Sequence, residues 1–158
     1  MIKIDKNEEK LFNFALQLLA NRQHSCAELR NKLLRKPFGT GEAVTKVIER
    51  LEKLKLLDDL TFAREWVRYR SERSPRGKLF LTFELRRKGI SREIIDHVFE
   101  DNDFEENLLA KEALRKKFDY LREKSSDKIQ NKLFSFLKNR GFNSSTIINS
   151  VRDFLAKS

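Results

Sequence analysis

The chain has 158 residues, of which 39% are hydrophobic and 37% are charged, and its formal net charge is +10. Only 5 glycines and 2 prolines are available for turns, which argues against an all-β fold and favours an all-α protein. A single cysteine excludes an internal disulfide, and no apolar run is long enough to predict a membrane span.

The first amphipathic run begins at Leu11, where apolar residues recur at the i, i+3, i+4 and i+7 spacing of one helix face. A second helix is predicted to begin at Ser25, because Ser25 and Glu28 form a capping box, and this helix places Leu33 in the core. Pro37 marks its end, and a further apolar stripe follows. We therefore predict a first three-helix unit, with its N-terminal lead-in, over residues 1–57.

The same order of helices is predicted twice more, because the apolar pattern of the second unit recurs 52 residues later in the third. The matching pairs are Leu81 and Leu133, Leu85 and Leu137, and Gly89 and Gly141. Glycine can adopt the left-handed conformation that ends a helix. We predict the second unit over residues 58–104 and the third over residues 105–158, packed as one array of tandem three-helix repeats.

Local signals predict the remaining boundaries. Ser74 followed by Pro75 is typical of a helix start, and Ser91 and Asn143 are predicted to cap the helices that follow the two glycine turns. The segment over residues 124–127 is the expected loop.

Two pairs of residues resemble reactive sites. His24 and Cys26 could form a thiolate pair, but no third partner is evident and we interpret them as structural. Asp58 and Asp59 could hold a divalent metal in a nuclease, but we expect them to cap the helix that begins near Thr61. With no catalytic constellation and no glycine-rich phosphate loop, the chain is predicted not to be an enzyme and to need neither cofactor nor metal.

The strongest functional signal is a basic segment in the middle of the chain. Residues 64–92 hold ten basic and three acidic side chains, and eight of the ten are arginines, whose planar guanidinium suits carboxylates and phosphates. Trp66 and Tyr69 could stack on bases, but their helical spacing favours the core, where most of the phenylalanines are also expected. The alternative for the whole segment is a solvated helix face. The candidate contact residues are Arg64, Arg68, Arg70, Arg73, Arg76, Lys78, Arg86, Arg87 and Lys88, with Arg30, Arg35 and Lys36 in the first unit.

A helix-turn-helix centred on Gly89 is a weaker interpretation. The helix around Ile94–Phe99 would then enter a DNA groove and carry acidic side chains, among them Glu93, Asp96 and Glu100, toward the phosphates. Their charge has the wrong sign for that position.

The spaced motifs resemble the RecX family of bacterial regulatory proteins. The resemblance is strong over residues 15–99. In the third unit, only the apolar pattern resembles the family. The residues that carry it are Arg22-x2-Ser25-x2-Glu28-Leu29-x2-Lys32-Leu33, then Leu57-Asp58-Asp59-x2-Phe62-Ala63-x3-Val67-x2-Arg70, and Gly77-x3-Leu81-x2-Glu84-Leu85-x2-Lys88-Gly89-Ile90.

The resemblance implies an elongated, curved array that binds along the groove of the RecA–DNA filament and inhibits the ATPase and strand-exchange activities of RecA. It also implies weak binding to single-stranded or duplex DNA, and a role in homologous recombination, DNA repair and the SOS response. We expect a cytoplasmic monomer with no membrane partner. Two alternatives stay open: a sequence-independent DNA-binding protein that acts without RecA, and a helical interaction array unrelated to recombination.

Overall fold

The computed structural model describes residues 5–100, 104–119 and 127–156, and these residues form helices and loops without a strand. The helices are α1 (Lys6–Asn21), α2 (Cys26–Leu34), α3 (Gly41–Lys53), α4 (Asp59–Arg73), α5 (Lys78–Arg87), α6 (Arg92–Glu100), α7 (Glu106–Phe118), α8 (Asp127–Asn139) and α9 (Ser144–Ala156). None of these helices is long and apolar enough to cross a membrane.

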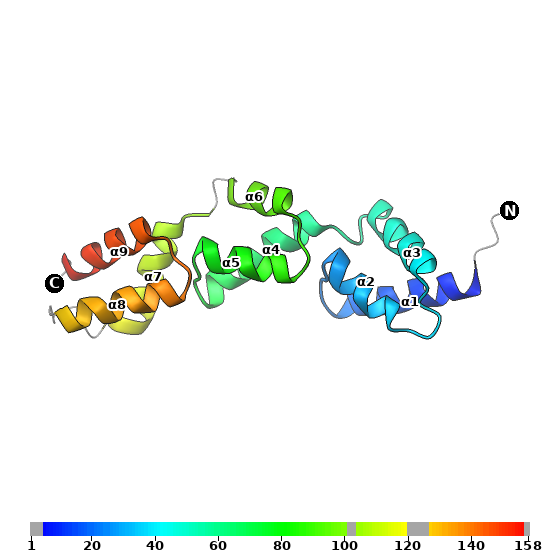
Figure 1. Cartoon of the computed structure of the whole chain (residues 1–158), viewed down its shortest axis with the longest axis horizontal. Coiled ribbons are helices and arrows are strands. Elements are labelled where there is room, and N and C mark those ends of the chain that lie inside the picture. The colour runs from blue at the N-terminus through cyan, green and yellow to red at the C-terminus, as the bar shows by residue number, and fades with distance from the viewer. Residues whose placement is uncertain (1–4, 101–103, 120–126, 157–158) are drawn as a thin grey trace.

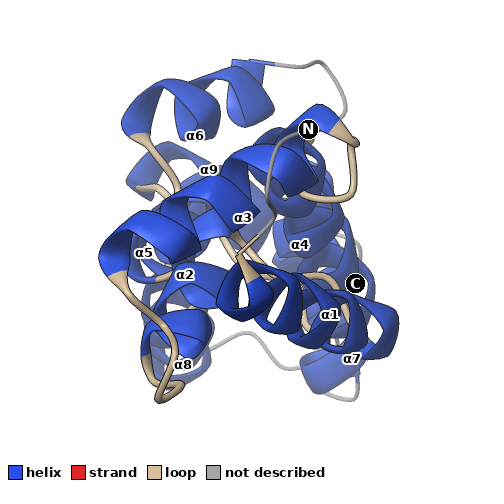
Figure 2. Cartoon of the chain, turned by 90° about the vertical axis from the view of Figure 1, so that its right-hand side faces the viewer, coloured by secondary structure: helices blue, strands red, loops and turns tan. Residues whose placement is uncertain are grey.

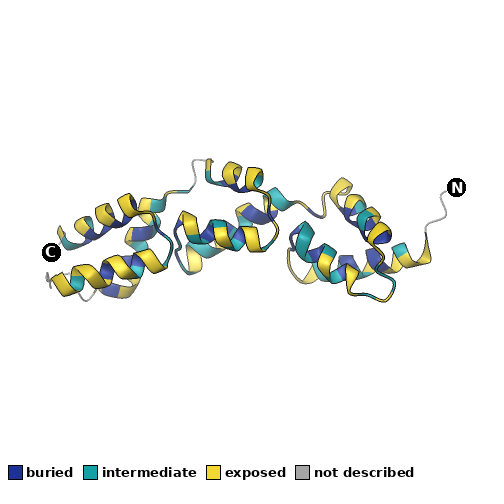
Figure 3. Cartoon of the chain, viewed as in Figure 1, coloured by how far each residue is buried: buried dark blue, intermediate teal, exposed yellow. Residues whose placement is uncertain are grey.

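The helices form three groups in a row, with the middle group slightly off the line that joins the outer two (Figure 1). Each group has its own hydrophobic core, so α1–α3, α4–α6 and α7–α9 are three repeats of one arrangement. Buried residues lie inside each group and exposed residues outside it (Figure 3). Viewed from the N-terminal end, the three groups overlap, as expected for an elongated array (Figure 2).

The predicted apolar stripes are the cores of these repeats. Leu33 and Leu85 are fully buried, and so are Leu81, Leu133 and Leu137. The Ser25 capping box is present, and Ser91 and Asn143 accept backbone hydrogen bonds at the starts of α6 and α9. Gly89 and Gly141 have φ values of +77° and +76°. These predictions are therefore confirmed.

The prediction that Ser74 and Pro75 begin a helix is wrong. Ser74 ends α4, and α5 begins three residues after Pro75, at Lys78. The amide of Gly77 donates instead to the carbonyl of Arg140 in the third repeat, at 2.9 Å. The segment between α4 and α5 is thus shaped by a contact between repeats, which local capping signals do not report.

Two aromatic residues of the middle repeat are exposed: Tyr69, whose predicted core position is wrong, and Phe83, which is an exception to the core position expected for most of the phenylalanines. Tyr69 is 48% exposed on α4, and Phe83 is 57% exposed on α5. Trp66 is half-buried, stacks against Phe62 and donates its indole N–H to Glu84 at 3.1 Å. Helical spacing places Tyr69 near the edge of the apolar stripe, where a small rotation of the helix decides its exposure.

The first and second repeats meet where the start of α2 contacts the end of α5, which we call the first junction. The Ser25 hydroxyl donates to the Lys88 carbonyl at 2.6 Å, and the Lys88 ammonium pairs with Glu28 at 2.8 Å. The amide of Cys26 donates to Asp59 at 2.8 Å. Gly89 lies so close to Ala27 that a β-carbon at Gly89 would overlap the Ala27 side chain.

The second junction uses the equivalent elements, the start of α5 and the end of α8. Besides the Gly77–Arg140 hydrogen bond, the amide of Leu79 donates to the Gly141 carbonyl at 3.2 Å. The Arg140 guanidinium donates to the carbonyl of Pro75 at 3.0 Å. A β-carbon at Gly77 would overlap the backbone of Gly141.

The junctions explain why Pro37 stands where the later repeats have glycine. Gly89 and Gly141 each combine a positive φ with close approach to the preceding repeat. No repeat precedes the first within the described residues, so the end of α2 has no such contact to make. The segment predicted as a loop over residues 124–127 lies outside the described residues, except for Asp127, which begins α8.

Candidate protein and nucleic-acid interface

The exposed part of the basic segment lies on α4 and α5. Arg64, Arg68 and Arg73 are exposed on α4, and Lys78, Arg86 and Arg87 are exposed on α5. Arg86 and Arg87 directly follow the buried Leu85, and neither forms an ion pair with any residue that the structure describes. Both guanidinium groups are therefore available to a carboxylate or a phosphate.

Three other basic residues of the segment are half-buried and contact other parts of the chain. Arg70 forms a bidentate pair with Glu84, with Nε 2.9 Å from Oε2, and Lys88 is committed to Glu28. Burial opposes the ionisation of Glu84, but the hydrogen bonds from Arg70 and Trp66 outweigh it and keep the pKa of this carboxyl below its usual value. Arg76 is half-buried over the Phe80 ring, at 4.5 Å from its centroid. A partner that contacts Arg70 or Lys88 would compete with these internal ion pairs, whereas the buried Nε of Arg76 has no hydrogen-bond partner among the described residues.

On α4, the exposed arginines have neighbours of their own. Arg68 pairs with Glu65, and Arg64 lies 3.5 Å from His97 of α6. Arg73 lies over the exposed Tyr69 ring, 5.2 Å from its centroid. An exposed aromatic ring beside a guanidinium is one way in which proteins hold single-stranded nucleic acid.

The candidates of the first repeat lie on α2 or just after its end, in the repeat that precedes α4 and α5 (Figure 1). Arg30 donates to the Thr45 hydroxyl at 3.0 Å, and the Lys36 ammonium lies 3.7 Å from the centroid of the Phe14 ring. Arg35 is exposed at the end of α2. The exposed candidates of the middle repeat thus lie on α4 and α5, and these three lie on or just after a different helix, in the neighbouring repeat.

The two pairs that resemble reactive sites have structural contacts. Asp58 caps α4 as predicted, but Asp59 instead accepts the Cys26 amide across the first junction. Burial, followed by the nearby Asp59 and Glu52 carboxyls, raises the pKa of the Cys26 thiol far above its usual value, so a reactive thiolate is disfavoured. His24 is buried and its Nδ1 lies 2.9 Å from the Arg22 carbonyl.

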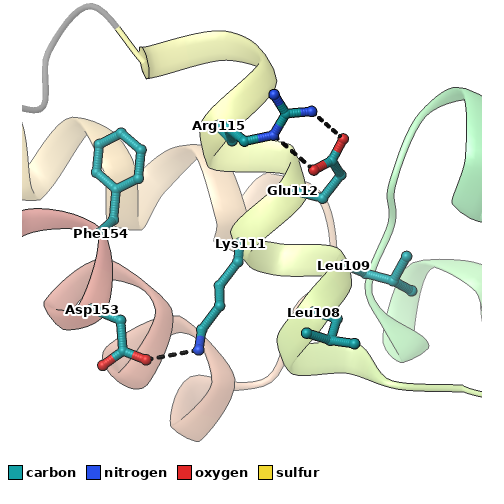
Figure 4. Close-up of a pocket in the computed structure, with 7 residues that line it drawn as sticks. All are labelled: Leu108, Leu109, Lys111, Glu112, Arg115, Asp153 and Phe154. Atoms are coloured by element: carbon teal, nitrogen blue, oxygen red, sulfur yellow. Dashed lines mark hydrogen bonds and ion pairs between the residues drawn. The ribbon is translucent and has the colours of Figure 1, made fainter. Parts of the chain in front are cut away.

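Two hollows adjoin α7, and the second of them also includes residues of the basic segment. One, of about 430 Å³, lies between α7 and α9, and Figure 4 shows its charged residues in internal pairs. It is lined by Leu108, Leu109, Lys111, Glu112, Arg115, Asp153 and Phe154. The other, of about 540 Å³, lies between α4 and α7, contains Arg64 and Arg68, and shares Leu108 and Leu109 with the first. Lys111 pairs with Asp153 at 2.8 Å and Arg115 with Glu112 at 2.9 Å, which leaves little uncompensated charge in the first hollow.

Comparison with known proteins identifies the same three units. Family models described as the first, second and third three-helix domains of RecX match residues 12–51, 58–98 and 105–148. The third unit, in which the sequence motifs are least evident, is therefore also matched.

The helix-turn-helix interpretation requires the acidic side chains of α6 to face outward. Glu93, Asp96 and Glu100 are all exposed on α6.

Relatives and solved structures agree with the family models. The chain is 42% identical over 143 residues to a protein named Regulatory protein RecX from Chlorobium phaeobacteroides, covering 90% of this chain and 92% of that one. It is 35% identical to one of the same name from Mycobacterium sp. strain KMS, with 94% and 84% covered. The crystal structure of RecX from Lactobacillus salivarius superposes with a TM-score of 0.84 at 22% identity, covering 98% of this chain and all of that one, which shows a shared fold.

Proposed function

The chain belongs to the RecX family of regulatory proteins, and from this premise we propose that it regulates the RecA recombinase. In this proposal, the protein binds along the groove of the RecA–DNA filament in the cytoplasm and inhibits the ATPase and strand-exchange activities of RecA. It acts by occupying the filament and catalyses no reaction of its own.

The observation that carries this proposal is the position of the free positive charge. Arg86 and Arg87 lie exposed on the middle repeat of an elongated array and form no ion pair with the residues that the structure describes. Basic side chains at such a surface attract carboxylates over long distances and set the orientation of the encounter. We propose that Arg64, Arg68, Arg73, Lys78, Arg86 and Arg87 provide this contact, whereas Arg70 and Lys88 mainly support the fold.

A second candidate, a DNA-binding protein that acts without RecA, is favoured by one observation. The exposed Tyr69 ring beside Arg73 would accept a stacked base. Against it, the acidic groups of α6 lie on the same repeat and would repel an extended phosphate backbone. We therefore propose weak DNA binding as an addition to the RecA contact.

The test is the ATPase activity of RecA on single-stranded DNA, titrated with this protein. The proposal predicts a progressive loss of ATP hydrolysis while the DNA is saturated with RecA. Binding to the bare DNA, measured in parallel, separates the two candidates, because competition for DNA alone predicts inhibition that disappears when DNA is in excess. An unchanged ATPase rate at saturating protein would contradict the regulatory role.

A further inference from the structure

The outer face of α5 combines apolar and basic residues in a way that the basic charge alone does not explain. Leu79 is 65% exposed and Phe83 is 57% exposed. With 3.6 residues per turn, Leu79, Phe83, Arg86 and Arg87 lie within about 100° of arc on one side of the helix. We call these four residues the α5 ridge. Large apolar side chains that are this exposed to water gain favourable free energy when a partner covers them.

The other repeats show that the fold does not need apolar residues at these positions. In α2 the positions equivalent to Leu79 and Phe83 are Ala27 and Asn31, and in α8 they are Asn131 and Ser135. Asn31, Asn131 and Ser135 are exposed and polar, and Ala27 is a small residue that packs against Gly89, while the inward-facing leucines are the same in all three helices. The apolar pair is thus a property of the middle repeat alone.

The charge around this pair indicates what covers it. The ridge itself contains no acidic residue, and Glu84, the one acidic residue of α5, faces α4 in its pair with Arg70. Arg87 lies over the Phe83 ring, 5.7 Å from its centroid, so the positive charge adjoins the apolar surface directly. A complementary surface would offer an apolar groove bordered by carboxylates.

We propose that the α5 ridge inserts into such a groove on a protein partner, with Leu79 and Phe83 as the anchors and Arg86 and Arg87 on the carboxylates at its border. This inference rests on the proposed function in that it assigns the groove to the RecA filament. A second copy of this chain is disfavoured because two basic ridges repel each other. A nucleic-acid strand is disfavoured because Leu79, the more exposed anchor, offers no ring for a base.

The test measures binding to RecA filaments on single-stranded DNA and to the bare DNA, using Leu79→Asn with Phe83→Ser. These changes copy Asn131 and Ser135 and leave both ridge arginines in place. We expect the affinity for filaments to fall at least about tenfold, because buried anchor residues supply most of the binding energy of an interface. The affinity for bare DNA and the salt dependence of filament binding should stay unchanged. A second double variant, Leu79→Ala with Phe83→Ala, guards against misfolding of the first, because alanine has a high helix propensity. It should weaken filament binding by a similar factor.

Ile148→Asn is the matched control, because Ile148 is 52% exposed on α9 of the third repeat. It should bind filaments like the wild type. Unchanged filament binding by both ridge variants overturns the inference, as does an equal loss on bare DNA or an equal loss with Ile148→Asn. If the wild type itself fails to bind filaments, the proposed function is wrong, and the ridge inference falls with it.

Discussion

The two junctions between repeats join equivalent helices, 52 residues apart in the chain, by different chemistry. At the first junction, side chains make the contact: the Ser25 hydroxyl, the Glu28–Lys88 ion pair and the Asp59 carboxylate. At the second, backbone groups of Gly77 and Leu79 meet backbone groups of Arg140 and Gly141, and the Arg140 guanidinium adds a hydrogen bond to the Pro75 carbonyl.

This difference has consequences for sequence tolerance and for pH. A backbone contact depends on the absence of a side chain, so the second junction should be intolerant of any β-carbon at Gly77. A contact made by ionisable groups depends on their protonation, so the first junction should respond to acid. The same repeat architecture thus gives one junction in which ionisable side chains make most of the hydrogen bonds and one in which the backbone makes them.

The largest effect is expected for Gly77→Ala. The new β-carbon would overlap the backbone of Gly141, which cannot move aside as a side chain can, and overpacking of this kind costs about 1–3 kcal/mol. Hydrogen exchange of the Gly77→Ala variant should be faster than in the wild type at α8 and at the start of α5, with a smaller increase in the first repeat. The control is Gly41→Ala at the start of α3, where a β-carbon has open space and stability should change by less than about 1 kcal/mol.

At the equivalent position of the first junction, Ser25→Ala should cost about 1–2 kcal/mol. It removes both the cap of α2 and the hydrogen bond to the Lys88 carbonyl, but it introduces no overlap. Urea unfolding monitored by circular dichroism gives the change in the free energy of unfolding. A cost equal to or above that of Gly77→Ala would reverse the distinction between the junctions.

The ion pair of the first junction should produce a smaller, pH-dependent effect. Burial opposes the ionisation of Glu28, but the hydrogen bonds from Lys88, Arg22 and Ser25 prevail and lower its pKa below the ordinary 4.5. Its stabilisation is therefore complete above about pH 4.5 and lost as the pH falls through the lower folded-state pKa. Glu28→Gln should cost about 1 kcal/mol at pH 7 and progressively less in acid. A cost that does not change with pH would show that the pair is not the source of the stabilisation.

The smallest effect is expected for Asp59→Asn. Burial raises the pKa of Asp59, so its ionisation opposes folding at neutral pH, and this cost disappears as the pH falls through the raised folded-state value toward 3.8. The asparagine oxygen can still accept from the Cys26 amide. Melting temperatures should therefore be equal to or slightly above those of the wild type at pH 7, with the difference vanishing near pH 3. A marked loss of stability at pH 7 would mean that the negative charge itself holds the junction.

The sequence predicts the core positions and helix ends within each unit, but it does not predict the contacts between units. Leu33, Leu85 and the two glycine turns follow from helical spacing and local conformation, and their positions are confirmed. The start of α5 and the role of Asp59 depend on residues 63 and 33 positions away, which no local pattern reports.

The candidate site shows the same division. The basic segment and the exposure of Arg86 and Arg87 could be predicted from charge and helical phase. The ion pair between Arg70 and Glu84 could not be predicted, and neither could the exposure of Tyr69 and Phe83. Both depend on how α4 and α5 are rotated relative to each other. A comparison of Phe83 with Asn31 and Ser135 would have been the one available signal.

Inhibition of RecA by a charge-reversed variant tests the central claim most directly. Arg86→Glu with Arg87→Glu reverses the free charge of α5, and Lys132→Glu with Lys138→Glu is the matched control on exposed positions of α8. With both variants shown to be folded, the RecA ATPase on single-stranded DNA should be inhibited by the control and largely released from inhibition by the α5 variant. Full inhibition by the α5 variant would contradict the account and leave its basic face as ordinary solvated surface.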